Sequence, residues 1–188
     1  MRSIAVFCGS NFGASEAYAE GARALGVALA RRSLTLIYGG AHKGLMGVLA
    51  DAVLDAGGAV TGIITQRLAD HGHGHPRLTA TEIVVDMIAR KREMTLRADA
   101  FVVLPGGIGT LEELFAVWAH SQIEGHHKPI GLLDIREYCT PLLRLIEHMV
   151  EERFLPGAHR DMLIVERSAD ALLDRFASYR PVTAPKWL

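Results

Sequence analysis

A glycine-rich turn followed by a carboxylate is the part of this chain whose residue types could do chemistry. The turn, PGGIGT at residues 105–110, follows a short apolar run at residues 100–104 and precedes Glu113. Glycines let backbone N–H groups approach a ligand closely, and the first N–H groups of a helix have no partner inside it. A strand that leads through such a turn into a helix therefore predicts an anion site, suited to a phosphate.

A purely structural role is the alternative interpretation of the same turn. Glycines between a strand and a helix can serve tight packing alone. Thr110 and Glu113 also fit a capping box, in which the threonine caps the helix and the glutamate accepts the N–H of the cap residue. The spacing of these residues alone leaves both interpretations open.

Arg90 and Lys91 are the cations that we expect near this turn. They lie near the start of a helix after the fourth expected strand, whereas Glu113 follows the fifth. If those strands are neighbours, a guanidinium and a carboxylate face a common cleft that could hold a sugar phosphate. The carboxylate would then lie where an oxocarbenium-like transition state builds positive charge. The alternative for Arg90 is a surface ion pair with Asp86, four residues earlier, worth about 0.2–0.5 kcal/mol.

The elements that must position these residues alternate along the chain. Apolar runs and helical patterns predict an α/β fold, a Rossmann-like doubly wound parallel sheet with helices on both faces. Expected strands cover residues 3–8, 34–38, 59–64, 82–85, 100–104, 129–133 and 162–165. Expected helices begin near Ser15, Gly44, Asp86 and Thr110, and cover residues 138–150 and 169–176.

Three glycine-bearing turns follow expected strands, at Gly9-Ser10, at Gly39-Gly40 and at residues 105–110. In an open parallel sheet, ligands bind beyond the carboxyl ends of the strands, near the point where the strand order reverses. The three turns and the start of the Asp86 helix should therefore meet along one edge. This convergence favours a functional role for the turn at residues 105–110.

The polar segment at residues 65–80 interrupts the alternation, and we expect it to be an active-site loop. It contains His71, His73 and His75. Catalytic zinc needs convergent ligands held by oriented neighbours, and a flexible glycine-containing loop does not provide them. We therefore expect no metal site. Phe115 and Trp118 fit the apolar face of a helix and are expected in the core.

Two common nucleotide signatures are missing. The segment from Gly39 to Gly44 resembles part of a P-loop in its spacing but lacks Gly-Lys-Ser/Thr. Lys43 in this segment could be a phosphate contact or a solvated loop residue, and we expect the second. The pattern G-x-G-x-x-G does not follow the first strand. Both ATP hydrolysis and nicotinamide chemistry are disfavoured.

Composition fits one globular domain covering residues 1–188, with an irregular tail from about residue 180. The formal net charge of −1 gives no reason to expect nucleic acid or membrane as a partner. The N-terminus does not read as a signal peptide, and no apolar stretch is long enough to span a bilayer. With only two cysteines, Cys8 and Cys139, a reducing cytoplasm is the expected location.

Together these motifs resemble the LOG (LONELY GUY) family of cytokinin riboside 5′-monophosphate phosphoribohydrolases, often labelled lysine decarboxylase-like. Residues 105–113 match its PGGxGTxxE signature, with Arg90-Lys91 upstream. The resemblance extends over about residues 4–155. It includes the sequences CGS (8–10), YGG (38–40), GLMG (44–47), DMIARK (86–91) and KPIGLL (128–133).

The resemblance implies hydrolysis of the N-glycosidic bond of a cytokinin riboside 5′-monophosphate, or of AMP, which releases the base and ribose 5-phosphate. It implies no cofactor, a homodimer, and Arg90 and Glu113 as catalytic residues. Arg90 would hold the phosphate or orient Glu113, which would stabilise the sugar or position water. The substrate- and phosphate-binding residues would be Gly9, Ser10, Gly39, Gly40, Arg90, Lys91, Gly106, Gly107, Ile108, Gly109, Thr110 and Glu113.

The sequence departs from the family pattern at three places. Ile108 stands where Tyr or Phe is usual, Ile88 stands where His is common, and residues 67–77 differ. The first two changes leave the expected catalytic pair intact, whereas the different loop leaves the base preference open.

Two other functions remain to be distinguished. A nucleotide-binding protein without turnover would keep the same glycine turn. A decarboxylase would need a Schiff-base lysine for pyridoxal phosphate, and the four lysines have no convincing setting for it.

Overall fold

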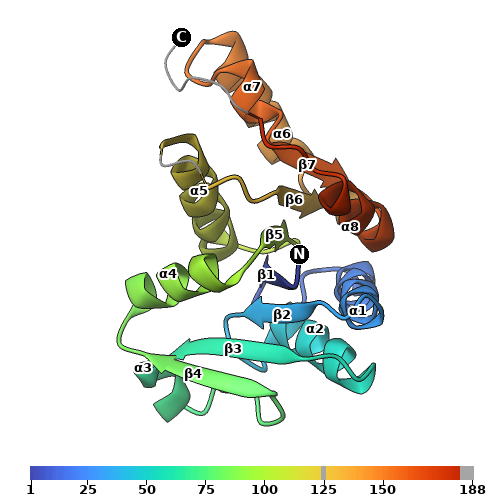
Figure 1. Cartoon of the computed structure of the whole chain (residues 1–188), viewed down its shortest axis with the longest axis vertical. Coiled ribbons are helices and arrows are strands. Elements are labelled where there is room, and N and C mark those ends of the chain that lie inside the picture. The colour runs from blue at the N-terminus through green and yellow to red at the C-terminus, as the bar shows by residue number, and fades with distance from the viewer. Residues whose placement is uncertain (124–125, 183–188) are drawn as a thin grey trace.

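A computed structural model describes residues 1–123 and 126–182. Its seven strands pair in parallel to form one sheet in the order β4-β3-β2-β1-β5-β6-β7 (Figure 1). The strands are β1 (Ser3–Phe7), β2 (Thr35–Tyr38), β3 (Val60–Thr65), β4 (Ala80–Val84), β5 (Ala100–Val103), β6 (Ile130–Leu133) and β7 (Leu163–Glu166). The expected fold class and all seven expected strands are confirmed.

Helices connect the strands. They are α1 (Glu16–Arg31), α2 (Gly44–Asp55), α3 (Gln66–Asp70), α4 (Met87–Arg97), α5 (Ile108–Ile123), η1 (Ile135–Glu137), α6 (Thr140–Glu151), α7 (Gly157–Arg160) and α8 (Ala169–Ala177). The six longer helices were expected from the sequence. The short helices were missed because about one turn shows no apolar periodicity. Residues 183–188 of the expected irregular tail lie outside the described part of the chain.

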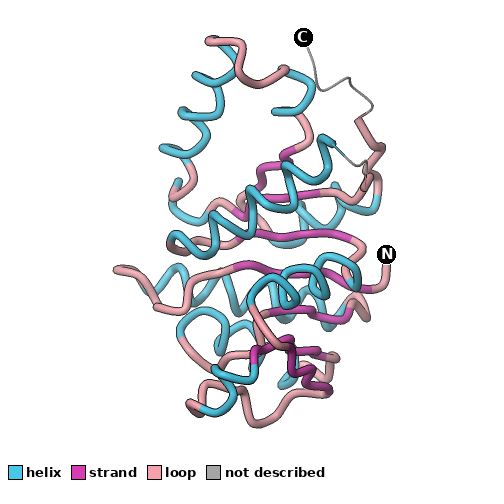
Figure 2. Tube along the Cα trace, turned by 90° about the vertical axis from the view of Figure 1, so that its left-hand side faces the viewer, coloured by secondary structure: helices cyan, strands magenta, loops and turns pink. Residues whose placement is uncertain are grey.

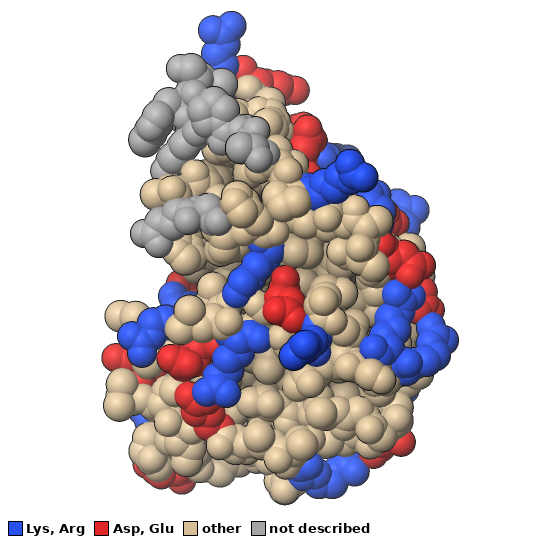
Figure 3. Space-filling view, in the orientation of Figure 1, with Lys and Arg blue, Asp and Glu red and all other residues tan. Residues whose placement is uncertain are grey.

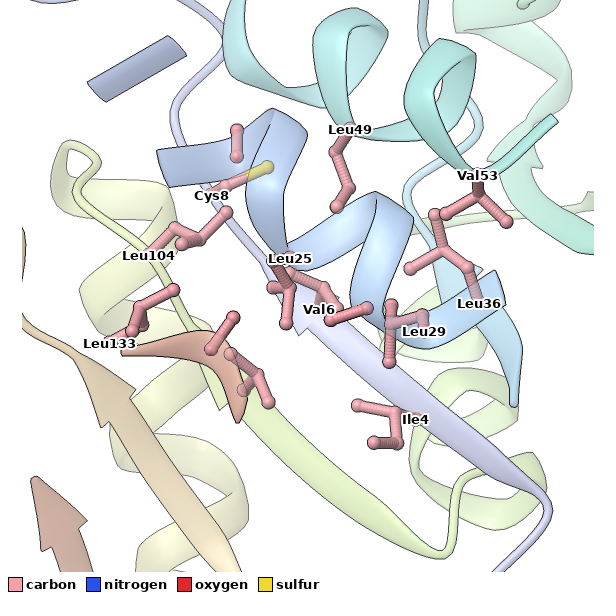
Figure 4. Close-up of a cluster of buried hydrophobic side chains, with 14 of the residues drawn as sticks. Ile4, Val6, Cys8, Leu25, Leu29, Leu36, Leu49, Val53, Leu104 and Leu133 are labelled. Carbon is pink, nitrogen blue, oxygen red and sulfur yellow. The ribbon is translucent and has the colours of Figure 1, made fainter. Parts of the chain in front are cut away.

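Helices cover both faces of the sheet, as Figures 1 and 2 show from two sides. One face packs against α1, α2 and α8 through side chains such as Leu25, Leu49 and Leu172. Figure 4 shows part of this apolar layer, with Cys8 near Leu104 at one end. The other face packs against α4, α5 and α6. Strands buried on both faces read as continuous apolar runs, as this sequence does.

The expected helix caps are confirmed at two helices and wrong at a third. Ser15 accepts the N–H of Ala17 at the start of α1, and the Asp86 carboxylate accepts the N–H of Ala89 at 2.7 Å in α4. α5 instead begins at Ile108, two residues before the expected start. The capping box proposed for Thr110 is therefore absent, because Thr110 already lies within the first turn.

The strand order changes how the charged pair is brought together. The fourth and fifth strands are not neighbours, since β3, β2 and β1 lie between them. α4 spans this distance and contacts all three of these strands. Arg90 therefore reaches the centre of the sheet edge on a crossing helix rather than from an adjacent strand.

The surface carries both signs of charge. Lys and Arg side chains lie among Asp and Glu on the face in Figure 3. Within residues 1–123 and 126–182, no helix is both long enough and apolar enough to cross a membrane.

Candidate active site

A cleft of about 490 Å³ opens beyond the carboxyl ends of β1 and β5. These neighbouring strands lie at the point where the strand order reverses, which is where ligands bind in open α/β sheets. The turns that follow the two strands touch, since the N–H of Gly9 donates to the carbonyl of Pro105 at 3.1 Å. The cleft is lined by residues 8–13 and 105–110, with Tyr18, Leu45, Met46, Met87, Arg90, Glu112, Glu113 and Tyr138.

The start of α5 forms the floor of the cleft with a row of backbone donors. The first helical bond runs from the N–H of Leu111 to the carbonyl of Gly107 at 3.1 Å. The N–H groups of residues 107–110 therefore have no partner inside the helix. These N–H groups lie at the positive end of the helix dipole, and together the two features favour binding of an anion.

Gly106 must be glycine for the two turns to meet. A Cβ there would overlap the side chain of Thr110 and lie 2.8 Å from the nitrogen of Gly9. At Gly107 and Gly109, by contrast, a Cβ would have no neighbour within 4 Å. The first glycine serves packing, whereas the other two leave space open in the cleft.

Arg90 is a buried cation in the wall of the cleft, with only 8% of its surface exposed. Its Nε donates to the carbonyl of Ile63 at 3.0 Å, and its Nη1 lies 3.5 Å from the sulfur of Met87. Arg90 and Asp86 both belong to the described part of the chain, and the alternative ion pair between them does not form. The carboxylate of Asp86 caps α4 instead. Burial lowers the pKa of the guanidinium, and the nearby Glu113 carboxylate opposes that shift.

Glu113 lines the same cleft from the second turn of α5 and is half-buried. Desolvation raises its pKa from 4.5 to about 7; Arg90 and Lys91 act in the opposite direction, and Glu112 adds to the rise. The structure thus brings Arg90 and Glu113 to one cleft. The two side chains, both within the described residues, interact through space without a direct ion pair.

Besides Arg90 and Glu113, ten residues were expected to bind the substrate, and eight of these lie in the wall of the cleft or at its rim. Gly9, Ser10, Gly106, Gly107, Ile108, Gly109 and Thr110 line it. Lys91 lies at the rim, where its ammonium forms an ion pair with Glu112, itself a lining residue.

Gly39 and Gly40 stand behind the cleft rather than in its wall. A Cβ at Gly39 would overlap the guanidinium of Arg90. Gly40 has a φ of 73°, a conformation that favours glycine, and its carbonyl accepts the N–H of His75 at 2.9 Å. Contact of these two glycines with a ligand therefore stays a prediction.

The histidine segment does not line the cleft, contrary to the expected active-site loop. It packs on the turn after β2, where Ala41 pairs with Gly74 and His42 donates its N–H to the carbonyl of His73. His75 is buried, with its Nε2 3.2 Å from a carboxylate oxygen of Asp51. Among the residues that the structure describes, no group of three or more His, Cys, Asp or Glu is placed to hold a metal.

Sequence reasoning missed three aromatic residues of the cleft, Phe12, Tyr18 and Tyr138. The rings of Tyr18 and Tyr138 meet edge to face with centroids 5.8 Å apart. Tyr138 was assigned to the start of a helix. The signal that could have found it is its place just after β6, because the carboxyl ends of all the parallel strands share one edge.

The fold and the cleft together define a class of protein. An open parallel sheet with a glycine turn, free helix N–H groups and a buried arginine at its switch point is typical of Rossmann-like proteins that bind phosphorylated ligands. The solved structures that match share this fold. The molybdenum cofactor binding protein from Rippkaea orientalis aligns with a TM-score of 0.71 and 19% identity over 94% of this chain and 96% of that one.

Similarity in sequence identifies the family. A family model described as "Possible lysine decarboxylase" matches residues 46–176. The cytokinin riboside 5′-monophosphate phosphoribohydrolase of Rhodococcoides fascians is 46% identical over 87% of this chain and 83% of its own length. The cytokinin riboside 5′-monophosphate phosphoribohydrolase LOG5 of Arabidopsis thaliana is 40% identical over 97% of this chain and 80% of its own length. The chain belongs to the LOG family.

Proposed function

We propose that this protein is a cytokinin riboside 5′-monophosphate phosphoribohydrolase. It hydrolyses the N-glycosidic bond of its substrate, so water and the nucleotide become a free base and ribose 5-phosphate. The observation that carries the proposal is the pairing of a buried arginine and a carboxylate of raised pKa in a cleft floored by free N–H groups. Family membership supports the same reaction.

The 5′-phosphate would bind at the start of α5. There the N–H groups of residues 107–110 and the guanidinium of Arg90 supply hydrogen bonds and positive charge. Lys91 would add charge from the rim. Fixing the phosphate would place the ribose over Glu113, so that binding energy from a non-reacting group serves to position the reacting bond.

Glu113 would act on the ribose. As the bond to the base breaks, positive charge develops on the sugar, and a carboxylate beside it stabilises that charge. A pKa of about 7 also suits proton transfer near neutral pH, because both protonation states are populated. Arg90 keeps this pKa from rising further and so favours the ionised form.

A chromatographic assay for free base tests the proposal. AMP and isopentenyladenosine monophosphate would be compared on wild type, on Glu113→Gln and on Glu147→Gln, which changes an exposed glutamate of α6. We expect wild type and Glu147→Gln to release base and Glu113→Gln to lose at least about 100-fold in rate. Thermal protection of the wild type by both nucleotides without base release would leave a binding protein and remove the enzyme assignment.

We also propose that the protein forms a homodimer through the rim of the cleft. Val85, Ile88 and Ile108 are large apolar side chains that are 87%, 75% and 88% exposed. Ile108 and Met87 line the cleft, so this apolar surface borders it. Such exposure in a small protein supports an interaction site. Light scattering should give twice the mass of one chain, and Ile88→Asp should halve it.

One domain and a cytoplasmic location complete the proposal. The single sheet that runs through the described residues supports one domain over residues 1–188. Cys8 and Cys139 are both free and buried, which is typical of a reducing compartment.

A further inference from the structure

The turn after β6 holds a backbone conformation that is unusual for its residues. Arg136 and Glu137 are consecutive non-glycine residues with φ of 57° and 59°. L-residues rarely adopt this left-handed region, and such strain persists where surrounding contacts require it. Here the buried carboxylate of Asp134 accepts the N–H of Cys139 at 2.8 Å, and the guanidinium of Arg136 donates to the hydroxyl of Ser15 at 3.1 Å.

The strained turn places Tyr138 over the glycine turn that follows β5. Its hydroxyl donates a hydrogen bond of 2.6 Å to the carbonyl of Gly106. Its ring lines the cleft and also a smaller, largely apolar cavity of about 260 Å³ behind the glycine turn. Tyr138 therefore stands at the boundary between these two spaces.

The hydrogen bond fixes one particular peptide group. The carbonyl of Gly106 and the N–H of Gly107 belong to the same trans peptide and point in opposite directions. With the carbonyl held by Tyr138, the N–H of Gly107 points away from the tyrosine. Gly107 lines the cleft but not the smaller cavity, and among the described residues its N–H has no acceptor. It is therefore free for a ligand in the cleft.

Without this restraint the peptide could turn over. It lies between two glycines, which allow more backbone conformations than any other residue. A turned peptide would present the Gly106 carbonyl to the cleft in place of the Gly107 N–H. A carbonyl oxygen repels an anion that the N–H would bind, so the orientation of this one peptide affects phosphate affinity directly.

We propose that Tyr138 is a positioning residue that holds the Gly106–Gly107 peptide with its N–H toward the cleft and thereby sets the affinity for the 5′-phosphate. The proposal rests on the proposed function in taking a ribose 5-phosphate group as the ligand. Tyr138 acts through the peptide, not on the reacting bond. Its loss should therefore change binding of the phosphate more than the rate of the bound complex.

Tyr138→Phe tests this, because it keeps the ring against Tyr18 and removes only the hydroxyl. Calorimetry on the full chain would measure Kd for ribose 5-phosphate and for adenine, and the base-release assay would give KM and kcat for AMP. We expect Kd for ribose 5-phosphate and KM for AMP to rise about five- to tenfold, as for a lost hydrogen bond. Kd for adenine should stay the same, and kcat should fall less than about twofold.

Tyr179→Phe is the matched control, since it removes the hydroxyl of a half-buried tyrosine that follows α8 and lies outside both cavities. It should change neither Kd. Equal Kd values for ribose 5-phosphate in wild type and Tyr138→Phe would overturn the proposal. Equal weakening of ribose 5-phosphate and adenine, with a lower Tm, would also overturn it by showing a structural role only. A wild type that binds ribose 5-phosphate but releases no base would refute the enzyme assignment, and the two Kd values would still decide the role of Tyr138.

Discussion

Gly39 lies so close to Arg90 that any side chain at position 39 would overlap the guanidinium. The glycine does not line the cleft, whereas the arginine does. The residue directly after β2 therefore lacks a side chain, and this creates the space that a buried cation occupies. Gly39 was expected to contact the phosphate. In the structure it instead makes room for Arg90, the residue expected to hold the phosphate.

Gly39→Ala should displace Arg90 and lower kcat/KM by about 100-fold, because a shift of about 1 Å in a positioning group can cost that much. The measurement is the base-release assay together with Kd for ribose 5-phosphate. Gly74→Ala is the control, since a Cβ there meets no atom within 4 Å. Wild-type kinetics in Gly39→Ala would mean that the guanidinium can move without consequence, and Arg90 would lose its assigned role.

Glu113 should give the reaction a pH dependence near neutrality. If the ionised carboxylate stabilises the sugar, kcat rises with pH through the pKa of about 7 and reaches a plateau above it. Because the substrate phosphate also titrates near pH 6, kcat is measured at saturating AMP, where binding no longer limits the rate. A kcat that falls through this range would instead assign the active form to the protonated acid.

Glu113 should also make the stability of the fold depend on pH, but stability should fall with rising pH where kcat rises. Its pKa is higher in the native protein than the ordinary 4.5, so between pH 4.5 and 7 the native state binds more protons than the unfolded chain. The free energy of unfolding therefore falls as pH rises through this range, by about 1–3 kcal/mol from Glu113. Urea denaturation of wild type and Glu113→Gln at pH 5 and 7.5 isolates this contribution. The variant should gain stability relative to wild type at the higher pH, and a difference independent of pH would contradict the raised pKa.

The order and type of the main elements could be predicted from the sequence because local patterns determine them. Ser15 and Asp86 cap their helices as expected, since a cap depends on the few residues beside it. The buried strands form continuous apolar runs, which predict a sheet covered on both faces. The convergence of the turns at Gly9 and Gly106 followed from parallel topology alone.

What the sequence did not predict depends on contacts between distant segments. The strand order places α4 across three strands, so Arg90 arrives by a route that its sequence neighbours do not indicate. α5 begins two residues before the expected start at Thr110, because the carbonyl of Gly107 accepts its first helical hydrogen bond. Tyr138 was not predicted as a site residue because its position depends on a strained turn and on a hydrogen bond to the carbonyl of Gly106, 32 residues away.

Gly109 allows stability and binding to be separated in a single substitution. It lies in the first turn of α5, and a Cβ there would face open space in the cleft. Alanine should raise the free energy of unfolding by up to about 1 kcal/mol, because glycine is the weaker helix former. The same methyl group would occupy space that a phosphate needs beside the free N–H groups, so Kd for ribose 5-phosphate should rise about tenfold or more.

Gly157→Ala is the control for this prediction, because it also places alanine at the start of a helix, with no neighbour closer than 3.9 Å to the new Cβ. It should match Gly109→Ala in the sign of its stability change and leave Kd for ribose 5-phosphate unaltered. Calorimetry gives Kd and urea denaturation gives the stability. If Gly109→Ala binds ribose 5-phosphate as tightly as wild type, the phosphate does not approach the start of α5. The anion site would then have to be sought among the N–H groups of the turn after β1, which also lines the cleft.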